Sequence, residues 1–162
     1  MKTDFGKVLK VLKDGQVQFI IIGGVAGLAH GLARATFDVD VVYARNRANL
    51  QRLAEALKPY DPYLRGAPPG LPFSWDERTV RAGLNFTLIT SLGDLDLLGE
   101  VTGAGTYEQL SPDCVEMEVF GVSCLCVTLE RLIQIKRAAG RPKDFEMIAQ
   151  MQALLEERRR HP

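Results

Sequence analysis

Two aspartates, Asp38 and Asp40, stand two residues apart in an apolar segment, and their type and spacing could do chemistry. Segment 37–43 alternates in the way that predicts a β-strand, on which both carboxylates project from one face. Ionised carboxylates held together in a partly buried place repel each other unless a cation neutralises them. Oxygen ligands at this spacing suit Mg²⁺, which commonly takes one or two carboxylates together with water and substrate phosphate. Asp-x-Asp also occurs at strand edges and turns that bind no metal, so the prediction needs support from other residues.

A second pair of carboxylates, Asp94 and Asp96, falls in the predicted strand 93–98. Two-metal phosphoryl transfer needs a carboxylate beyond the bridging pair, to orient the nucleophile and hold the second ion. Asp96 is followed directly by apolar residues and is the predicted third ligand. Asp94 is expected to be solvated beside it.

A double glycine, Gly23-Gly24, follows the apolar run 17–22, a predicted buried strand, and precedes a predicted helix. Glycine lets a phosphate approach the backbone, and a helix start offers unpaired N–H donors. The alternative is a tight strand-to-helix turn without a ligand. A dinucleotide-binding loop is disfavoured because segment 23–27 does not fit G-x-G-x-x-G, and a P-loop is excluded because no Gly-Lys-Ser/Thr follows.

The helix predicted after Thr128, which can cap it, has a lysine on its apolar side. Leu129, Leu132, Ile133 and Lys136 recur at i, i+3, i+4 and i+7 and so share one face. Lys136 either reaches an anionic ligand from this face or extends its aliphatic stem past the helix edge to water. The residues themselves favour neither alternative.

The remaining elements must position these groups. They are a helix at 4–14, a helix at 46–58, strands at 84–91, 115–120 and 122–127, and a final helix that starts near Pro142 with an inner face formed by Phe145, Ile148, Gln152 and Leu155. Segment 59–75 contains five prolines and two glycines and predicts a loop. It is too long for a tight connection, so a lid or a substrate-facing element is expected there.

Composition places the chain among ordinary globular proteins: it has 162 residues, 46% hydrophobic and 25% charged. One domain is expected. A disordered chain and a disulfide scaffold are both disfavoured, and the three cysteines are expected to be reduced packing residues: Cys114, Cys124 and Cys126.

The lack of an apolar run of about 18 residues and the charged N-terminus predict a cytoplasmic protein without a membrane partner.

The zero net charge is an uneven sum. Residues 1–90 carry a net charge of +4, residues 91–130 have eight acidic and no basic side chains, and residues 131–162 return to +4. Neutrality excludes a protein that coats nucleic acid through charge alone. The pattern fits either a metal-binding centre flanked by cations or solvated faces that happen to cluster.

The order and spacing of these elements resemble the nucleotidyltransferases of the DNA polymerase β superfamily: Gly-Gly, thirteen residues, Asp-x-Asp, then a later strand acid. The fuller pattern is similar to the toxin-associated AbiEii and MenA branch and its uncharacterised relatives. That pattern comprises Gly23-Gly24-Val25-Ala26, His30-Gly31, Arg34, Thr36, Asp38-Val39-Asp40, the helix 129–136 and Gly140-Arg141-Pro142-Lys143-Asp144. The resemblance covers residue 19 to about residue 155.

The resemblance implies a fold and a set of roles. The fold would be α/β of the α+β type, a mixed sheet flanked by helices in a single domain 1–162, with an N-terminal helix 4–14, a core at about 17–127 and C-terminal helices at about 128–158. Two Mg²⁺ ions would be held by Asp38, Asp40 and Asp96. Nucleoside triphosphate would lie against the remaining motif residues: Gly23, Gly24, Arg34, Thr36, Lys136, Lys143 and Asp144. Of these, Lys136 would act with the three aspartates in catalysis.

The implied reaction moves a nucleoside monophosphate from a triphosphate to an acceptor hydroxyl on an RNA end, such as that of transfer RNA, on a protein or on a small molecule. A toxin–antitoxin component with a cognate partner protein is also implied. The basic tail 158–160 fits RNA and equally a solvated helix end. Many superfamily members have Gly-Ser where this chain has Gly23-Gly24. The missing hydroxyl favours the alternative of a weakly active or inactive module that binds nucleotide or a partner, whereas the aspartates favour the enzyme.

Overall fold

The computed structural model describes residues 2–162, and its first helix, α1 (Phe5–Asp14), lies where the apolar spacing predicts it. Asp4 caps the helix by accepting a hydrogen bond from the Lys7 amide at 3.0 Å, and Gly15 follows its last residue. The residues that repeat on one face are buried: Val8, Leu9 and Leu12. Burial of this stripe attaches α1 to the sheet.

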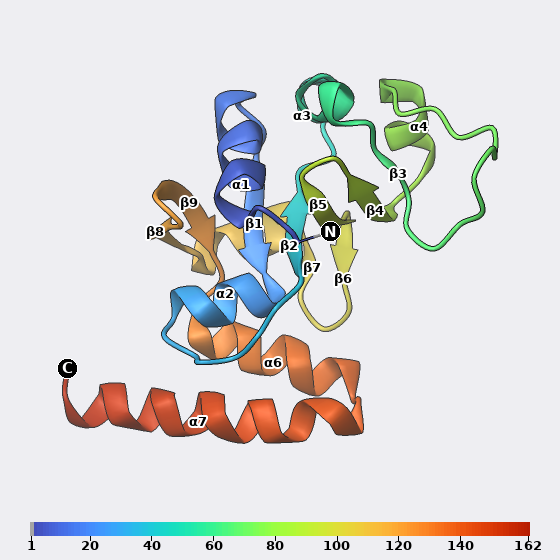
Figure 1. Ribbon diagram of the computed structural model, residues 1–162. Helices are drawn as coiled ribbons and strands as arrows, with labels where there is room; N and C mark the ends of the chain where they lie inside the picture. The colour runs from blue at the N-terminus through green and yellow to red at the C-terminus, as the bar shows by residue number, and fades with distance from the viewer. Residues whose placement is uncertain (1) are drawn as a thin grey trace.

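A seven-stranded mixed sheet forms the centre of the molecule (Figure 1). In spatial order its strands are β3 (Tyr63–Leu64), β4 (Asn85–Thr90), β5 (Gly93–Leu98), β2 (Asp38–Tyr43), β1 (Phe19–Ile22), β9 (Val122–Cys126) and β8 (Val115–Val119). The pairs β2–β5 and β1–β9 are parallel, and the other neighbours are antiparallel. The predicted mixed sheet flanked by helices is confirmed.

The two faces of the central strands differ in polarity. On β2, Val39 and Val41 are fully buried, whereas Asp38 and Asp40 on the other face are only partly covered. The helices α1 and α3 (Arg47–Leu57) pack against each other in the upper part of Figure 1. In the lower part of that view lie α2 (Gly23–Ala29), α6 (Leu129–Ala139) and α7 (Phe145–Arg160).

Helix α6 begins directly after Thr128, and α7 begins three residues after Pro142, behind a short turn. Thr128 caps α6 by accepting from the Arg131 amide at 3.1 Å, and Gly140 ends it in the left-handed conformation, with φ of 64°. The predicted inner face of α7 is partly wrong. Ile148 and Met151 are buried, but Phe145 is 62% exposed. The short turn η3 (Pro142–Asp144) precedes α7, and α7 packs on α6. Phe145, the first residue of α7, lies on the side of the helix that faces away from this contact.

Several short elements have no clear periodicity in the sequence. They are η1 (Lys58–Tyr60), α4 (Glu77–Ala82), the two-stranded sheet of β6 (Glu100–Val101) and β7 (Gly105–Thr106), α5 (Tyr107–Leu110) and η2 (Ser111–Asp113). The proline-rich segment 59–75 also contains β3, which pairs with β4 at the sheet edge.

Cys124 and Cys126 are buried free thiols, as predicted. None of the helices within residues 2–162 has the length and hydrophobicity that a membrane crossing requires.

Candidate active site

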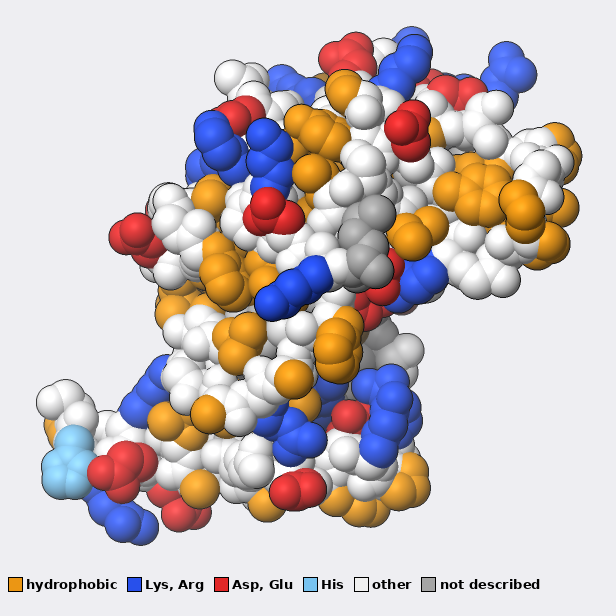
Figure 2. All heavy atoms as spheres, viewed as in Figure 1, with side chains coloured by type: hydrophobic (Ala, Val, Ile, Leu, Met, Phe, Trp, Pro, Cys, Tyr) orange, Lys and Arg blue, Asp and Glu red, His pale blue; other side chains and the backbone are white. Residues whose placement is uncertain are grey.

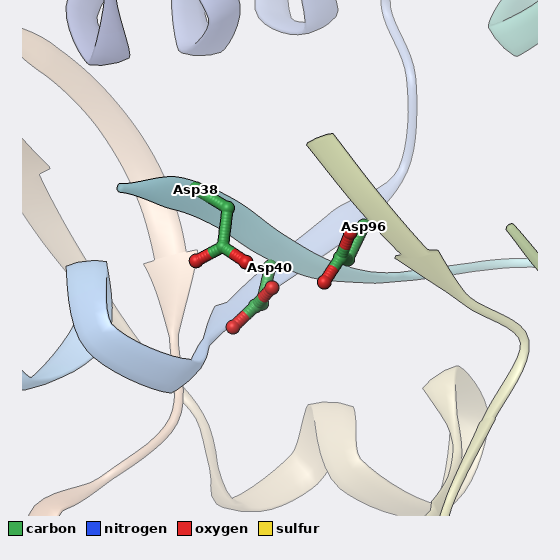
Figure 3. Close-up of side chains that lie close together, drawn as sticks. All are labelled: Asp38, Asp40 and Asp96. Atoms are coloured by element: carbon green, nitrogen blue, oxygen red, sulfur yellow. The ribbon is translucent and has the colours of Figure 1, made fainter. Parts of the chain in front are cut away.

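Three carboxylates converge from two neighbouring strands. Asp38 and Asp40 lie on β2, and Asp96 lies on β5, opposite Asp40 in the parallel register. One oxygen of each carboxylate lies within 4.8 Å of the other two, and Figure 3 shows the three side chains directed into the same space. Strand alternation therefore places Asp38 and Asp40 on one face, and the register brings the third predicted ligand to them.

Asp40 is the most strongly perturbed member of this triad, by which we mean Asp38, Asp40 and Asp96. Its Oδ1 is buried and has no hydrogen-bond partner among residues 2–162. Burial, followed by the charges of Asp38 and Asp96, raises the pKa of Asp40 to about 8. Burial and the charge of Asp96 also raise the pKa of Asp38. An unpartnered buried oxygen among three carboxylates fits a divalent cation, which would satisfy that oxygen and offset the repulsion.

Gly23 allows α2 to begin directly against the triad. Its φ is +67°, a conformation that L-residues rarely adopt, and a Cβ at this position would collide with the Asp40 carboxylate. At Gly24 the place of a Cβ is taken by the Thr36 side chain, with its hydroxyl oxygen nearest. The double glycine therefore sets the distance from the start of α2 to Asp40 and to Thr36.

Lys136 reaches the site from α6. Its side chain is only 14% exposed, and its positive charge lowers the pKa of Asp40. The Lys136 Nζ atom lies 3.8 Å from Oδ1 of Asp144, which is 5% exposed and accepts a 2.8 Å hydrogen bond from Nε of Arg141. Asp144 is thus the buried anion of the α6–α7 turn and faces Lys136.

Within residues 2–162, three other motif residues form no hydrogen bond or ion pair with the triad. Nη1 of Arg34 approaches Gln150 on α7 at 3.4 Å, and Lys143 is exposed on η3. His30 is buried, with Nε2 2.7 Å from the Val127 carbonyl, and its helix-end packing excludes it from the site as a base.

Sequence reasoning missed Arg65, which directly follows β3. Its guanidinium forms ion pairs with Asp96 at close range, with Asp94 at 3.6 Å and with Asp38 at 3.7 Å. Asp94, expected to be solvated, is instead part of this ion-pair network. No periodic pattern marks Arg65 in the proline-rich segment, and only the pairing of β3 with β4 brings it to the triad.

The site opens into a hollow on the right-hand side of Figure 2, where acidic and basic side chains lie together between the β3–α4 region above and the α6–α7 pair below. A cavity of about 620 Å³ adjoins Asp94 and is lined by Thr36 and Phe37 among others. Phe37 is 76% exposed.

Solved structures with the same fold come from nucleotidyltransferases. The lincosamide antibiotic adenylyltransferase LnuA, in its lincomycin-bound form, matches with a TM-score of 0.59 and 15% identity over 94% of this chain and 98% of LnuA. A candidate nucleotidyltransferase from Thermotoga maritima matches with a TM-score of 0.57 and 14% identity over 92% of this chain and 90% of the other. The fold is that of the nucleotidyltransferases. No protein-family model and no curated protein matches the sequence.

Proposed function

We propose that this protein is a Mg²⁺-dependent nucleotidyltransferase, which moves a nucleoside monophosphate from a nucleoside triphosphate to an acceptor hydroxyl. The observation that supports this most strongly is the convergence of Asp38, Asp40 and Asp96, with an unpartnered buried oxygen on Asp40, on a nucleotidyltransferase fold. Fold alone hosts many activities, so the proposal depends on these side chains.

The triad would hold the metal ions, which when bound would stabilise the charge that builds up on the phosphate oxygens. In the proposed step the acceptor oxygen bonds to the α-phosphorus, the bond from that phosphorus to the α–β bridging oxygen breaks, and pyrophosphate leaves with the electron pair. Asp96 orients the acceptor hydroxyl and takes its proton. Lys136, from the opposite wall, neutralises negative charge on the phosphates.

Thr36 could supply the hydroxyl that the serine of the Gly-Ser motif provides in many members of the superfamily. Its hydroxyl lies against Gly24, where a serine side chain would otherwise begin. This hydroxyl donates to the Asp38 carbonyl at 3.3 Å. We assign it to a phosphate oxygen, to which it would donate after turning from that carbonyl, with Gly23 and Gly24 providing close backbone approach. Arg34, which lines a small cavity with Gly23 and Gly24, and the exposed Lys143 are assigned to the outer phosphates.

The acceptor is assigned to the cavity beside Asp94, because Asp94 and Asp96 share one face of β5. The lincomycin bound to LnuA supports a small-molecule hydroxyl as one acceptor class. An RNA end, a protein side chain and a role in a toxin–antitoxin pair stay predictions from the sequence motifs. The rival hypothesis, a nucleotide-binding or partner-binding module without turnover, predicts binding but no transfer.

Label transfer tests the proposal. The purified chain is incubated with Mg²⁺, each α-phosphate-labelled triphosphate, and either total RNA, protein lysate or a panel of small hydroxyl compounds. We expect metal-dependent transfer that Asp38→Asn and Asp40→Asn abolish. Asp14→Asn, an equal change at an exposed acid of α1, should leave the transfer intact. Transfer that persists in both triad variants would contradict the proposal, and nucleotide binding without transfer would favour the module.

A further inference from the structure

Within residues 2–162, Arg65 is the cation that forms ion pairs with the triad. Its guanidinium contacts Asp38, Asp94 and Asp96, and its side chain is 25% exposed. Asp40 is the one carboxylate of this group that it does not contact within residues 2–162. Arg65 therefore neutralises the outer part of the site, whereas Asp40 has no ion pair within residues 2–162 and only the longer-range charge of Lys136 acts on it.

A divalent ion held by the triad needs oxygen atoms from Asp38 and Asp96, the same carboxylates that Arg65 contacts. A guanidinium remains charged at any physiological pH. Two cations that share the same ligands repel each other, and the repulsion is strong in a partly buried place. Binding of the ion and the present position of Arg65 therefore oppose each other.

The element that holds Arg65 is small enough to move. Its amide donates to the Thr87 carbonyl at 3.0 Å, and its Nε and Nη2 donate to the Leu88 carbonyl at 3.3 and 2.9 Å. The amide bond continues the pairing of β3, a strand of two residues at the sheet edge, where a short ladder has little stability of its own. Gly66 follows immediately, with space around its Cα.

Asp94 offers Arg65 a partner when the ion is bound. It lies beside Asp38 in the strand register but does not belong to the metal-binding group. We propose that Arg65 is a displaceable counter-cation: a divalent ion drives it from Asp38 and Asp96 towards Asp94, so that metal binding is coupled to the position of the proline-rich segment 59–75. This inference rests on the proposed function only in requiring that the triad binds a metal ion.

The coupling predicts that removing the Arg65 charge strengthens metal binding. We would measure the Mn²⁺ affinity of the full chain, without nucleotide, from the electron paramagnetic resonance signal of free Mn²⁺. Arg65→Gln should tighten Mn²⁺ binding by at least about 5-fold, the lower end of typical coupling between sites. Arg65→Lys, which keeps the charge, should remain near the wild type. Arg52→Gln removes one exposed charge from α3 and should leave the affinity unchanged.

The opposite role, in which Arg65 holds Asp96 in place for the ion, predicts weaker binding in Arg65→Gln. Weaker or unchanged affinity in that variant would overturn the inference. If neither the wild type nor Arg65→Gln binds Mn²⁺, the metal site of the proposed function fails, and the inference fails with it.

A second measurement uses the wild type alone and does not depend on the folding of a variant. Trypsin cleaves after an arginine only when the side chain can leave its ion pairs. Addition of Mn²⁺ should therefore accelerate cleavage between Arg65 and Gly66, as identified from fragment masses. The rate at Arg52 in α3 is the internal control. Cleavage at Arg65 that is slower with Mn²⁺, or unchanged, would contradict the displacement.

Discussion

The carboxylate of Asp40 is held in a form that prefers a proton in the folded chain. Burial and two neighbouring carboxylates raise its pKa from 3.8 to about 8, so the folded state binds this proton more tightly than the unfolded state. A group of this kind contributes most stability at low pH, and the contribution is lost as the pH rises from about 4 to about 8. A cation at the site would reverse this effect by favouring the ionised form.

We therefore expect Asp40→Asn to change the pH dependence of stability in a metal chelator. The wild-type free energy of unfolding should contain a component that falls between pH 5 and pH 8, and the variant should lack it. At pH 9 the variant should have the higher Tm, by about 2–4 °C for each kcal/mol of relieved repulsion. Calorimetry at a series of pH values measures this. Equal pH dependence in the two proteins would contradict the expectation.

Gly23 offers a second test at the residue scale. Gly23→Ala adds a Cβ that collides with the Asp40 carboxylate, in addition to the strain of a positive φ. Gly121→Ala is the matched control, because Gly121 has φ of +79° and open space around it. Urea unfolding should show a cost of about 1 kcal/mol for the control and a larger cost for Gly23→Ala. Mn²⁺ affinity should fall only in Gly23→Ala.

The α6–α7 turn is the element that places Lys136 opposite the triad. Asp144 in this turn is buried and paired with both Lys136 and Arg141. Asp144→Asn should therefore destabilise the protein by about 1–3 kcal/mol, because it leaves the largely buried ammonium of Lys136 without its anion. Urea unfolding measures this. Glu156→Gln, in an exposed pair with Arg160, should cost no more than about 0.5 kcal/mol. Equal stability of Asp144→Asn and the wild type would show that the ion pairs of Asp144 are not structural.

The arginines of the basic tail, in the last turn of α7, differ in their contacts. Arg158 donates to the His30 carbonyl at 2.6 Å and lies 3.2 Å from His30 Nδ1, so it joins α7 to the end of α2. Arg160 is exposed. Arg158→Gln should lower the free energy of unfolding by about 1 kcal/mol, and Arg160→Gln should change it by less than about 0.5 kcal/mol. Chemical denaturation measures the stability of both variants. Equal effects would argue against a stabilising contact between Arg158 and His30.

At the scale of the whole molecule, the C-terminal helices α6 and α7 are attached to the rest of the domain. Ile148 and Met151 of α7 are buried in the common core, and Arg158 bonds to His30 at the end of α2. The predicted single domain 1–162 should therefore unfold in one cooperative transition. Scanning calorimetry should give equal calorimetric and van't Hoff enthalpies. A separate transition for the C-terminal helices would show that they form their own unit.

The charge pattern along the chain becomes a spatial arrangement in the folded molecule. Asp96 from the acidic middle meets Asp38 and Asp40 from the first basic segment, and Lys136 approaches from the second. Arg65 adds a cation that charge counting could not place. The balance of these groups at one site explains how a chain of zero net charge can present a strongly charged centre.

Much of the fold could be predicted because its signals are local. Helix spacing located α1 and α6, and the cap Thr128 marked the start of α6. The outward direction of Phe145 was not predictable in the same way. It depends on the turn η3 and on which side of α7 meets α6, and both follow from contacts between distant residues.

The same distinction holds for the site. The sequence by itself determined that Asp38 and Asp40 share a face, because strand alternation is a property of consecutive residues. Only the tertiary structure decided that β2 and β5 are parallel neighbours in the register that sets Asp96 beside Asp40. Only the tertiary structure brought Arg65 to the same carboxylates. The pairing of distant strands depends on the packing of the whole sheet, which no local pattern of residues encodes.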